Sequence, residues 1–327
     1  MTDRLSLAVA RGIVALPEGE VLVLGAVADS DLGALDKART RLLWRYHDAH
    51  LALAARGWTS VRKPGGPADG VVVFAPRARE AQRAYLRLAR EMTDGPIIVD
   101  GPKSHGIDAL YREIRQRADV SEAWSKAHGK VFVVNGGDFS DWPEIHPAKG
   151  ADGWWRAPGV FSADGIDKAS AFLATELPLK LEGAVLDLGA GWGYLSRAIL
   201  ERDGVTALTL VENDETALRA AYRNVEDDRA AFVCADVRTW RPDQPVDHVV
   251  TNPPFHAGRA SDPELGRAFI LAAADMLKPK GQLWLVANRH LPYESTLEDA
   301  FRNVQTLTPN PSFKLFHATS PKPRRKG

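Results

Sequence analysis

Short apolar runs recur along the second half of the chain, and each is followed by small or polar residues. The runs cover residues 183–188, 207–211, 231–235, 246–251, 282–287 and 313–317. Amphipathic helical patterns over residues 194–202, 214–224, 263–277 and 295–302 separate most of them. Strands that alternate with helices in this way are typical of a doubly wound α/β domain, with helices on both faces of the sheet.

The first half of the chain repeats this order of apolar strands. Residues 21–26 parallel 185–190, residues 69–76 parallel 247–254, residues 95–99 parallel 281–285, and residues 130–134 parallel 314–317. Such repetition favours a duplicated fold, although two unrelated α/β sheets would also share some likeness. We therefore predict two tandem Rossmann-like domains with mixed seven-stranded sheets, over residues 1–150 and 151–320, and a basic tail over 321–327.

Composition narrows the class of protein. The chain has 327 residues, 42 of them basic and 42 acidic. This balance argues against a tight, sequence-blind nucleic-acid binder but leaves room for an RNA enzyme that uses local basic patches. Cys234 is the only cysteine, which excludes a disulfide framework and a cysteine-rich metal site within one chain. Without a signal pattern or an apolar run of about 20 residues, we expect a cytoplasmic protein without membrane or metal partners.

A glycine-rich turn follows the first strand of the second half. Gly189, Gly191 and Gly193 are spaced differently from the G-x-G-x-x-G turn of dinucleotide-binding proteins, and Asp187 precedes them on the strand. A carboxylate at that place would repel a pyrophosphate but can pair with an ammonium group. The turn therefore predicts a cationic cofactor without phosphate, S-adenosylmethionine, while a nucleotide-binding turn of another kind remains the alternative.

Two further acids end the next two strands. Glu212 follows residues 207–211, and a carboxylate at this place can accept hydrogen bonds from both ribose hydroxyls of an adenosine. Asp236 follows residues 231–235, where it could accept from the adenine amino group. The alternative for Asp236 is that it only caps the next turn.

The fourth strand runs into the sequence Asn252-Pro253-Pro254-Phe255-His256. Two prolines cannot continue a sheet, so the strand must end there, with Asn252 and the carbonyl of Pro253 as a rigid pair of acceptors. Two fixed acceptors can hold the two hydrogens of an –NH2 group and aim its lone pair, so that catalysis is mostly alignment. Phe255 offers a flat face to a planar target, and His256 either contacts the target or only lies on the loop.

The first half lacks these chemical groups. Val23 stands where Asp187 would be, Phe74 stands where Asn252 would be, and only Gly25 remains of the glycines. A valine cannot pair with an ammonium group, and a phenylalanine offers no amide acceptor. We infer that the first copy of the fold is degenerate and has lost both the cofactor and catalysis.

Basic residues suggest where RNA could bind. Arg79, Arg83, Arg87 and Arg90 are spaced by four, four and three residues, which places them on one face of a helix. This face could contact RNA phosphates, or it could simply be solvated. Arg259, after the Pro-Pro strand end, could likewise reach a phosphate or lie on the surface.

Together these motifs resemble the bacterial ribosomal RNA guanine-N2 methyltransferases of the RsmC type. The likeness also includes Pro158-Gly159-Val160-Phe161-Ser162, Asp164-Gly165, Asp167, Val286-Ala287-Asn288, Leu291-Pro292-Tyr293 and Gly101-Pro102-Lys103. The resemblance implies transfer of a methyl group from S-adenosylmethionine to the N2 amine of a flipped-out guanosine in ribosomal RNA or a ribosomal subunit. It also implies that Phe161 shapes the pocket near the methyl donor and that the first domain places the RNA.

The chain departs from the family at two places, and other functions remain. Of the glycine and serine that usually follow the upstream aspartate only Ser170 is kept, and Trp192 is bulky for a cofactor loop. A methyltransferase of adenine amines or protein glutamine would need the same two acceptors. A non-catalytic ribosome-assembly factor could keep the fold, and a nicotinamide dehydrogenase is disfavoured by the glycine spacing.

Overall fold

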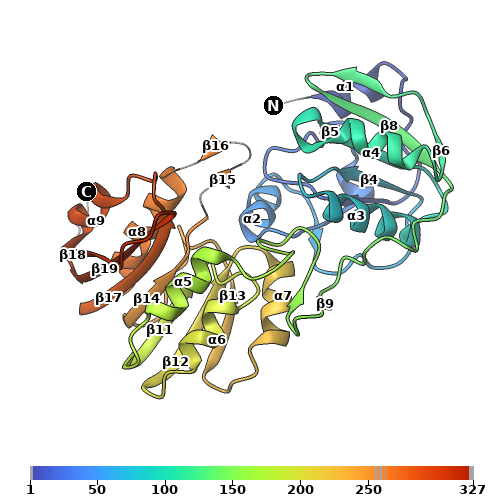
Figure 1. Cartoon of the computed structure of the whole chain (residues 1–327). Coiled ribbons are helices and arrows are strands. Elements are labelled where there is room, and N and C mark those ends of the chain that lie inside the picture. Colours follow the sequence, from blue (N-terminus) through green and yellow to red (C-terminus); the bar gives the residue numbers. More distant parts are fainter. Residues whose placement is uncertain (1–2, 255, 258–259, 262, 324–327) are drawn as a thin grey trace. The chain divides into compact units, whose positions relative to one another are not determined.

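The computed structural model describes residues 3–254, 256–257, 260–261 and 263–323, with no side-chain description for residues 256–257 and 260–261 (Figure 1). The chain forms two compact units. The first comprises Met1–Pro147 with Ala157–Gly159, and the second comprises Ala148–Arg156 with Val160–Gly327. No helix among the described residues is both long and apolar enough to cross a membrane.

The second unit contains a seven-stranded sheet in the order β13-β12-β11-β14-β17-β19-β18. Its strands are β11 (Gly183–Leu188), β12 (Val205–Glu212), β13 (Ala230–Cys234), β14 (Val246–Thr251), β17 (Leu277–Asn288), β18 (Phe301–Leu307) and β19 (Phe313–Pro321). Its helices are α5 (Lys168–Glu176), α6 (Tyr194–Leu200), α7 (Glu215–Asn224), α8 (Pro263–Met276) and α9 (Glu294–Ala300). The strands from β13 to β17 are parallel, and β19 runs antiparallel to both of its neighbours. The predicted mixed sheet is therefore confirmed.

Both faces of this sheet are buried. Along β11, Leu186 lies in one core with residues of α8 and α9, whereas Val185 lies in a second core with residues of α5, α6 and α7. Successive side chains of a strand point to opposite faces, so a strand covered on both sides must be apolar throughout. This burial explains why the central strands form nearly continuous apolar runs.

The edge of the sheet differs from the sequence prediction. Strand β18 (Phe301–Leu307) was not predicted, because it pairs only with β19 and keeps most of its side chains exposed, so it has no apolar run. Helix α9 correspondingly ends at Ala300 rather than at residue 302. Strand β17 begins at Leu277, since that residue already pairs with Val246 of β14.

The first unit repeats the same strand order, β3-β2-β1-β4-β5-β8-β6. Its strands are β1 (Val21–Leu24), β2 (Thr40–Leu43), β3 (Ser60–Val61), β4 (Gly70–Phe74), β5 (Ile97–Pro102), β6 (Asp119–Val120), β7 (Trp124–Lys126) and β8 (Gly129–Asn135), and its helices are α1 (Arg4–Ala10), α2 (His47–Ala55), α3 (Arg79–Met92) and α4 (Ile107–Ile114). The sheet has eight strands rather than seven, because the short β7 pairs with β8 in a hairpin. The duplicated fold is confirmed.

The strand order of the second sheet reverses between β11 and β14. In doubly wound folds, ligands bind at such a switch point, outside the carboxyl ends of the strands. Thr251, at the end of β14, donates a hydrogen bond of 2.7 Å to the carbonyl of Leu188 at the end of β11. The two strand ends are thereby tied together at the place where a ligand site is expected.

Candidate active site

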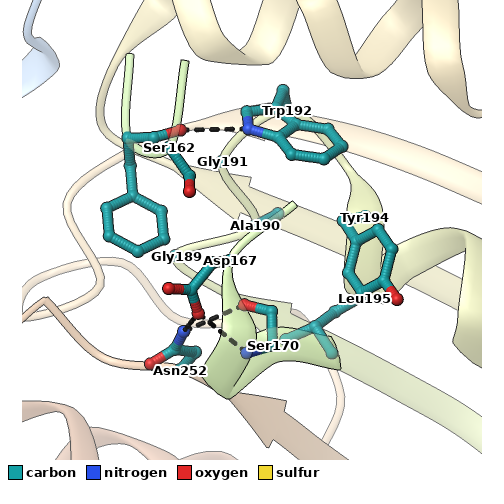
Figure 2. A pocket seen from close by; sticks show the side chains of 11 residues that line it. Ser162, Asp167, Ser170, Gly189, Ala190, Gly191, Trp192, Tyr194, Leu195 and Asn252 are labelled. Carbon is teal, nitrogen blue, oxygen red and sulfur yellow. Dashed lines mark hydrogen bonds between the residues drawn. The ribbon is translucent and has the colours of Figure 1, made fainter. Parts of the chain in front are cut away.

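A pocket opens at this switch point of the second unit (Figure 2). It is lined by Phe161, Ser162, Asp167, Ser170, Gly189, Ala190, Gly191, Trp192, Tyr194, Leu195 and Asn252. Its volume, including the open mouth, is about 380 Å³. The pocket lies where a doubly wound fold binds its ligand, outside the carboxyl ends of β11 and β14.

The glycine loop forms one wall of the pocket. Gly189, Gly191 and Gly193 have φ values of +73°, +56° and +91°, a region that residues with a Cβ rarely adopt. A Cβ on Gly191 would meet no atom within 4 Å, so this glycine presents bare backbone to open space. The loop is fixed from below, because the amides of Gly189 and Ala190 donate to the carbonyl of Val211 at 2.8 and 3.2 Å.

Trp192 fits this loop because its side chain packs elsewhere. Its indole Nε1 donates to the carbonyl of Phe161 at 3.0 Å (Figure 2). Its ring meets the rings of Trp154 and Tyr194 edge-on. Only 4% of Trp192 is exposed, whereas 53% of Phe161, which also lines the pocket, is exposed. The bulky residue therefore supports the segment that carries Phe161 instead of filling the pocket.

Asp187 lies beneath the loop and is fully buried. Its Oδ2 accepts a hydrogen bond of 2.6 Å from the hydroxyl of Ser196, and its Oδ1 has no hydrogen-bond partner among the described residues. Burial, together with the nearby charge of Glu212, raises the pKa of Asp187 to about 7, although the hydrogen bond from Ser196 opposes the rise. Asp187 does not itself line the pocket, so its predicted contact with a ligand ammonium stays a prediction.

Glu212 joins the end of β12 to the glycine loop. Its Oε2 accepts from the amide of Gly191 at 2.8 Å, and its Oε1 accepts from the amide of Asp214 at 2.8 Å. Burial raises the pKa of Glu212 to about 6, although these backbone hydrogen bonds oppose the rise. Each carboxylate oxygen can accept more than one hydrogen bond, so both oxygens keep acceptor capacity beside these backbone contacts. The predicted contact of Glu212 with ribose hydroxyls stays a prediction.

The raised pKa of Asp187 predicts a pH-dependent stability. Its carboxyl has an ordinary pKa near 3.8 in the unfolded chain and about 7 in the fold, so its stabilising contribution is present below about pH 4 and is lost as the pH rises through about 7. Between about pH 4 and 7, the free energy of unfolding should fall less in Asp187→Asn than in the unmodified protein. It is measured by chemical unfolding in the absence of cofactor. Asp243→Asn, at an exposed position, is the control. A constant difference between Asp187→Asn and the unmodified protein at every pH would contradict this account.

Asn252 is held in one orientation by two residues of the α5 segment. Its Nδ2 donates to Asp167 Oδ2 at 2.9 Å and to Ser170 Oγ at 2.9 Å (Figure 2). Asp167 Oδ2 also accepts from the amide of Ser170 at 2.8 Å, which caps α5. An ionised carboxylate can only accept, so the NH2 side of Asn252 must face Asp167 and its Oδ1 must face away. Asp167 and Ser170 were not predicted as site residues.

Pro253 and Pro254, which follow Asn252, are not among the residues that line the pocket. Pro253 is buried and Pro254 is exposed after the end of β14. Phe255, Arg259 and the side chain of His256 lie outside the described residues.

Asp236 is engaged by its own turn. Its Oδ1 accepts from the amide of Arg238 at 2.8 Å, and its Oδ2 pairs with the Arg238 guanidinium at 2.6 Å. This geometry corresponds to the alternative, a turn cap, and Asp236 does not line the pocket. Its contact with an adenine stays a prediction.

The model of the methyltransferase small domain family matches residues 154–317, which is half of the chain and contains the pocket and its strands. The chain belongs to this family. This family assignment of the chain agrees with the features of the site. They are the glycine loop, the acids at the ends of β11 and β12, and Asn252 at the end of β14. The predicted family resemblance and the predicted class of enzyme, a methyltransferase, are confirmed.

Relatives extend the likeness over both units. Ribosomal RNA small subunit methyltransferase C of Pseudomonas putida (strain GB-1) is 27% identical over 326 residues, covering 92% of this chain and 95% of the relative. The protein of that name from Hahella chejuensis is 29% identical over 270 residues, covering 76% and 77%. The solved structure of the T. thermophilus 16S rRNA N2 G1207 methyltransferase (RsmC), in complex with AdoMet and guanosine, matches with a TM-score of 0.79 and 26% identity, covering 94% of this chain and 90% of that one.

The first unit of this methyltransferase has packed side chains at the equivalent place. A Cβ on Gly25 would lie 2.3 Å from the carbonyl oxygen of Phe74 and 3.0 Å from the ring of Tyr85. The backbone after β4 is also engaged, because Gln82 donates to the carbonyl of Pro76 at 2.6 Å and a ring nitrogen of His105 lies 2.9 Å from the carbonyl of Ala75. The backbone carbonyls at this degenerate strand end therefore already have partners within the unit.

The arginine stripe of the first unit is already paired within the domain. Arg79 and Arg83 bind Glu113 at 2.8 and 2.6 Å, Arg87 binds Glu144 at 2.9 Å, and Arg90 donates to the carbonyls of Thr93 and Gly95. Groups that are paired with carboxylates gain less from an RNA phosphate than free ones do. Contact of this stripe with RNA stays a prediction, and the geometry does not favour it.

Proposed function

We propose that the second unit transfers a methyl group from S-adenosylmethionine to the N2 amine of a guanosine in small-subunit ribosomal RNA. The observation that carries this proposal is the fixed carboxamide of Asn252 at the end of β14. The relatives named ribosomal RNA small subunit methyltransferase C and the solved RsmC structure with AdoMet and guanosine support the substrate class. The reaction would take place in the cytoplasm.

The residues of the pocket fit the cofactor. Gly191 offers open space where a side chain would block a ligand, and the unpaired Oδ1 of buried Asp187 favours a cationic group nearby. Glu212, at the next strand end, would hold the ribose hydroxyls, and Phe161 would cover the donor. When bound, S-adenosylmethionine supplies an activated methyl group on a positively charged sulfur.

Asn252 and Pro253 would hold the target amine. With its NH2 group turned toward Asp167, Asn252 presents Oδ1 as an acceptor, and the carbonyl of Pro253 is the second acceptor. Each accepts one N–H of the amine, which aims the nitrogen lone pair without a strong base. Alignment of this kind can lower a barrier by several kcal/mol. Phe255 would stack on the planar base, and His256 would contact the same nucleotide.

The preference for guanine over other amines rests on the relatives. The two acceptor oxygens of Asn252 and Pro253 do not by themselves distinguish guanine from other amines. An adenine amine or a glutamine amide would also satisfy two oxygen acceptors, and protein glutamine remains the second candidate substrate. A purely structural assembly factor would not need an open pocket beside a fixed carboxamide. The first unit has Val23 and Phe74 at the matching strand ends instead, and we infer that it contributes to RNA placement without catalysis.

Asp167 is a positioning residue for Asn252, and Asp167→Asn tests this role. Asparagine is also a good helix cap, so the start of α5 should be kept. It can donate as well as accept, so it no longer forces one orientation on the Asn252 amide. We expect kcat to fall about 10–100-fold, while the dissociation constant for S-adenosylmethionine and the melting temperature change little. Rates, binding and melting are measured on the same preparation.

Asp36→Asn is the matched control, because Asp36 caps the short helix Lys37–Arg39 through Ala38 in the other unit. It should leave kcat unchanged. If Asp167→Asn has normal turnover, or if its loss of rate is matched by an equal loss of stability, the positioning role is wrong.

Transfer of labelled methyl groups tests the substrate class. Purified small ribosomal subunits and naked small-subunit RNA, both from cells that lack this enzyme, are incubated with the protein and labelled S-adenosylmethionine. We expect the label in RNA. Label in ribosomal protein would replace the proposal with its glutamine alternative, and no label in either substrate would overturn it.

A further inference from the structure

A group of exposed and half-buried aromatic and arginine side chains lies beside the pocket on the second unit. We call Trp154, Trp155, Arg197, Tyr222 and Arg223 the aromatic–arginine surface. They come from the hairpin of β9 (Ala148–Lys149) and β10 (Trp155–Arg156) and from helices α6 and α7 (Figure 1). Nothing in the catalytic arrangement uses these side chains.

The surface is rigidly built, because one buried side chain fixes the hairpin to α7. Asn224 accepts from the amide of Trp155 at 2.8 Å and donates to its carbonyl at 2.8 Å. The same Nδ2 donates to the carbonyl of Trp192, in the glycine loop, at 2.8 Å. The hairpin, α7 and the wall of the pocket therefore share one hydrogen-bonded centre.

Two arginines of the surface are available to an anion. The Arg197 guanidinium lies 4.5 Å from the centre of the Trp154 ring, and that of Arg223 lies 5.5 Å from the centre of the Trp155 ring. Both arginines are exposed, and neither forms an ion pair within the part of the chain that the structure describes. The neighbouring Arg219 differs, since it pairs with Glu215 at 3.3 Å. The arginines are held by aromatic faces, which leaves their outer N–H groups for a ligand.

A flat aromatic face is exposed on α7 at Tyr222, the residue before Arg223. Tyr222 is 55% exposed, and its ring is stacked on Phe232 of β13, with centres 3.9 Å apart and planes 21° apart. A ring that is supported from below loses little freedom when a base stacks on its outer side. Fixed aromatic rings alternating with arginines are the usual composition of single-stranded nucleic-acid sites.

The surface is continuous with the rim of the pocket. The ring of Trp154 lies 5.1 Å from that of Trp192 and 5.6 Å from that of Tyr194, and both of these residues line the pocket. A strand that places one nucleotide in the pocket would have its next nucleotides near these rings.

We propose that the aromatic–arginine surface binds single-stranded RNA next to the target nucleotide. Arg197 and Arg223 bind phosphates, and Tyr222 stacks on a base. The site rests on the proposed function in so far as the RNA is the methyl acceptor. It explains how a chain with no net charge can bind RNA, through a local patch rather than through overall charge.

The test is the double variant Arg197→Glu/Arg223→Glu, with naked small-subunit RNA as the probe. The dissociation constant is measured from about 50 to 200 mM salt. Each lost phosphate contact on a single strand should reduce the slope of log K against log salt by about 0.7, so the slope should fall by about 1.4 and affinity at low salt by about tenfold or more. Tyr222→Ala should weaken binding while the salt slope stays unchanged.

The matched control is Lys280→Glu/Arg302→Glu, which makes the same change of charge at exposed positions of β17 and β18. Binding of S-adenosylmethionine should be normal in all variants, which checks the fold of the pocket.

If the Arg197/Arg223 variant and the control have equal slopes of log K against log salt, the surface does not bind RNA, even if the unmodified enzyme methylates RNA. If the slope is reduced but the unmodified enzyme transfers no methyl group, the surface binds RNA and the proposed function is wrong.

Discussion

Asn252→Ala is expected to lower kcat by about 10³-fold or more while the dissociation constant for S-adenosylmethionine changes little. Removal of one preorganised polar group from a transition-state site typically costs about 10²–10³-fold in rate. Here the loss should be at the upper end, because the same side chain both binds the amine and orients its lone pair. The alanine also leaves Asp167 and Ser170 without the NH2 group that they now bind.

Single-turnover rates and calorimetric binding of the cofactor separate the two effects in this variant. Asn303→Ala, on the exposed edge strand β18, is the control for the same substitution and should have normal rates. Normal turnover of Asn252→Ala would refute the amine-holding role. A loss of cofactor binding as large as the loss of rate would assign Asn252 to the cofactor instead.

Gly191→Val is expected to abolish cofactor binding, with at least about a 100-fold increase in the dissociation constant, which corresponds to about 2.7 kcal/mol. The added side chain would enter the open space that the bare backbone of Gly191 now faces. The φ of +56° also strains any residue with a branched Cβ, at a cost of about 1–3 kcal/mol. The melting temperature alone therefore cannot report on the cofactor site.

Gly136→Val is the control that separates backbone strain from blockage of the cofactor site. Gly136 has a φ of +62°, and a Cβ added to it would meet no atom within 4 Å, so it matches Gly191 in backbone and space. It lies in the first unit, after β8. We expect the two variants to be destabilised alike and only Gly191→Val to lose the cofactor, as measured by calorimetry. Equal cofactor affinity in both variants would show that Gly191 does not face the ligand.

The main features of the fold follow from local sequence patterns. The strand before Gly189 and the strand before Pro253 are largely apolar, and they end at a glycine-rich turn and at a pair of prolines, so their ends could be located. The duplicated architecture followed from the matched order of such runs. Strand β18 could not be predicted, because an edge strand with one partner needs no apolar run.

The orientation of the site could not be read from the sequence. Asp167 and Ser170 lie 85 and 82 positions before Asn252, and only the packing of α5 against the switch point brings them together. The pairing of Arg83 likewise depends on Glu113, which lies 30 positions later on α4. The periodicity of arginines placed them on one helix face but carried no information about the carboxylates opposite.

The two units differ sharply at equivalent strand ends. The same strand order carries Asp187 and the oriented carboxamide of Asn252 in one unit, and Val23 and Phe74 at the matching positions in the other. We infer that the first copy has lost the groups that would bind and orient a ligand. We therefore expect one active site in a chain that contains two copies of the fold.

Nucleoside analysis of methylated RNA tests the central claim most directly. Small-subunit RNA that has received labelled methyl groups from the enzyme is digested to nucleosides, which are separated and identified by mass. The account predicts that the label is in N2-methylguanosine and that Asn252→Ala removes it. Label in a methylated adenosine, or in a ribose, would contradict the assignment of the pocket to the guanine amine.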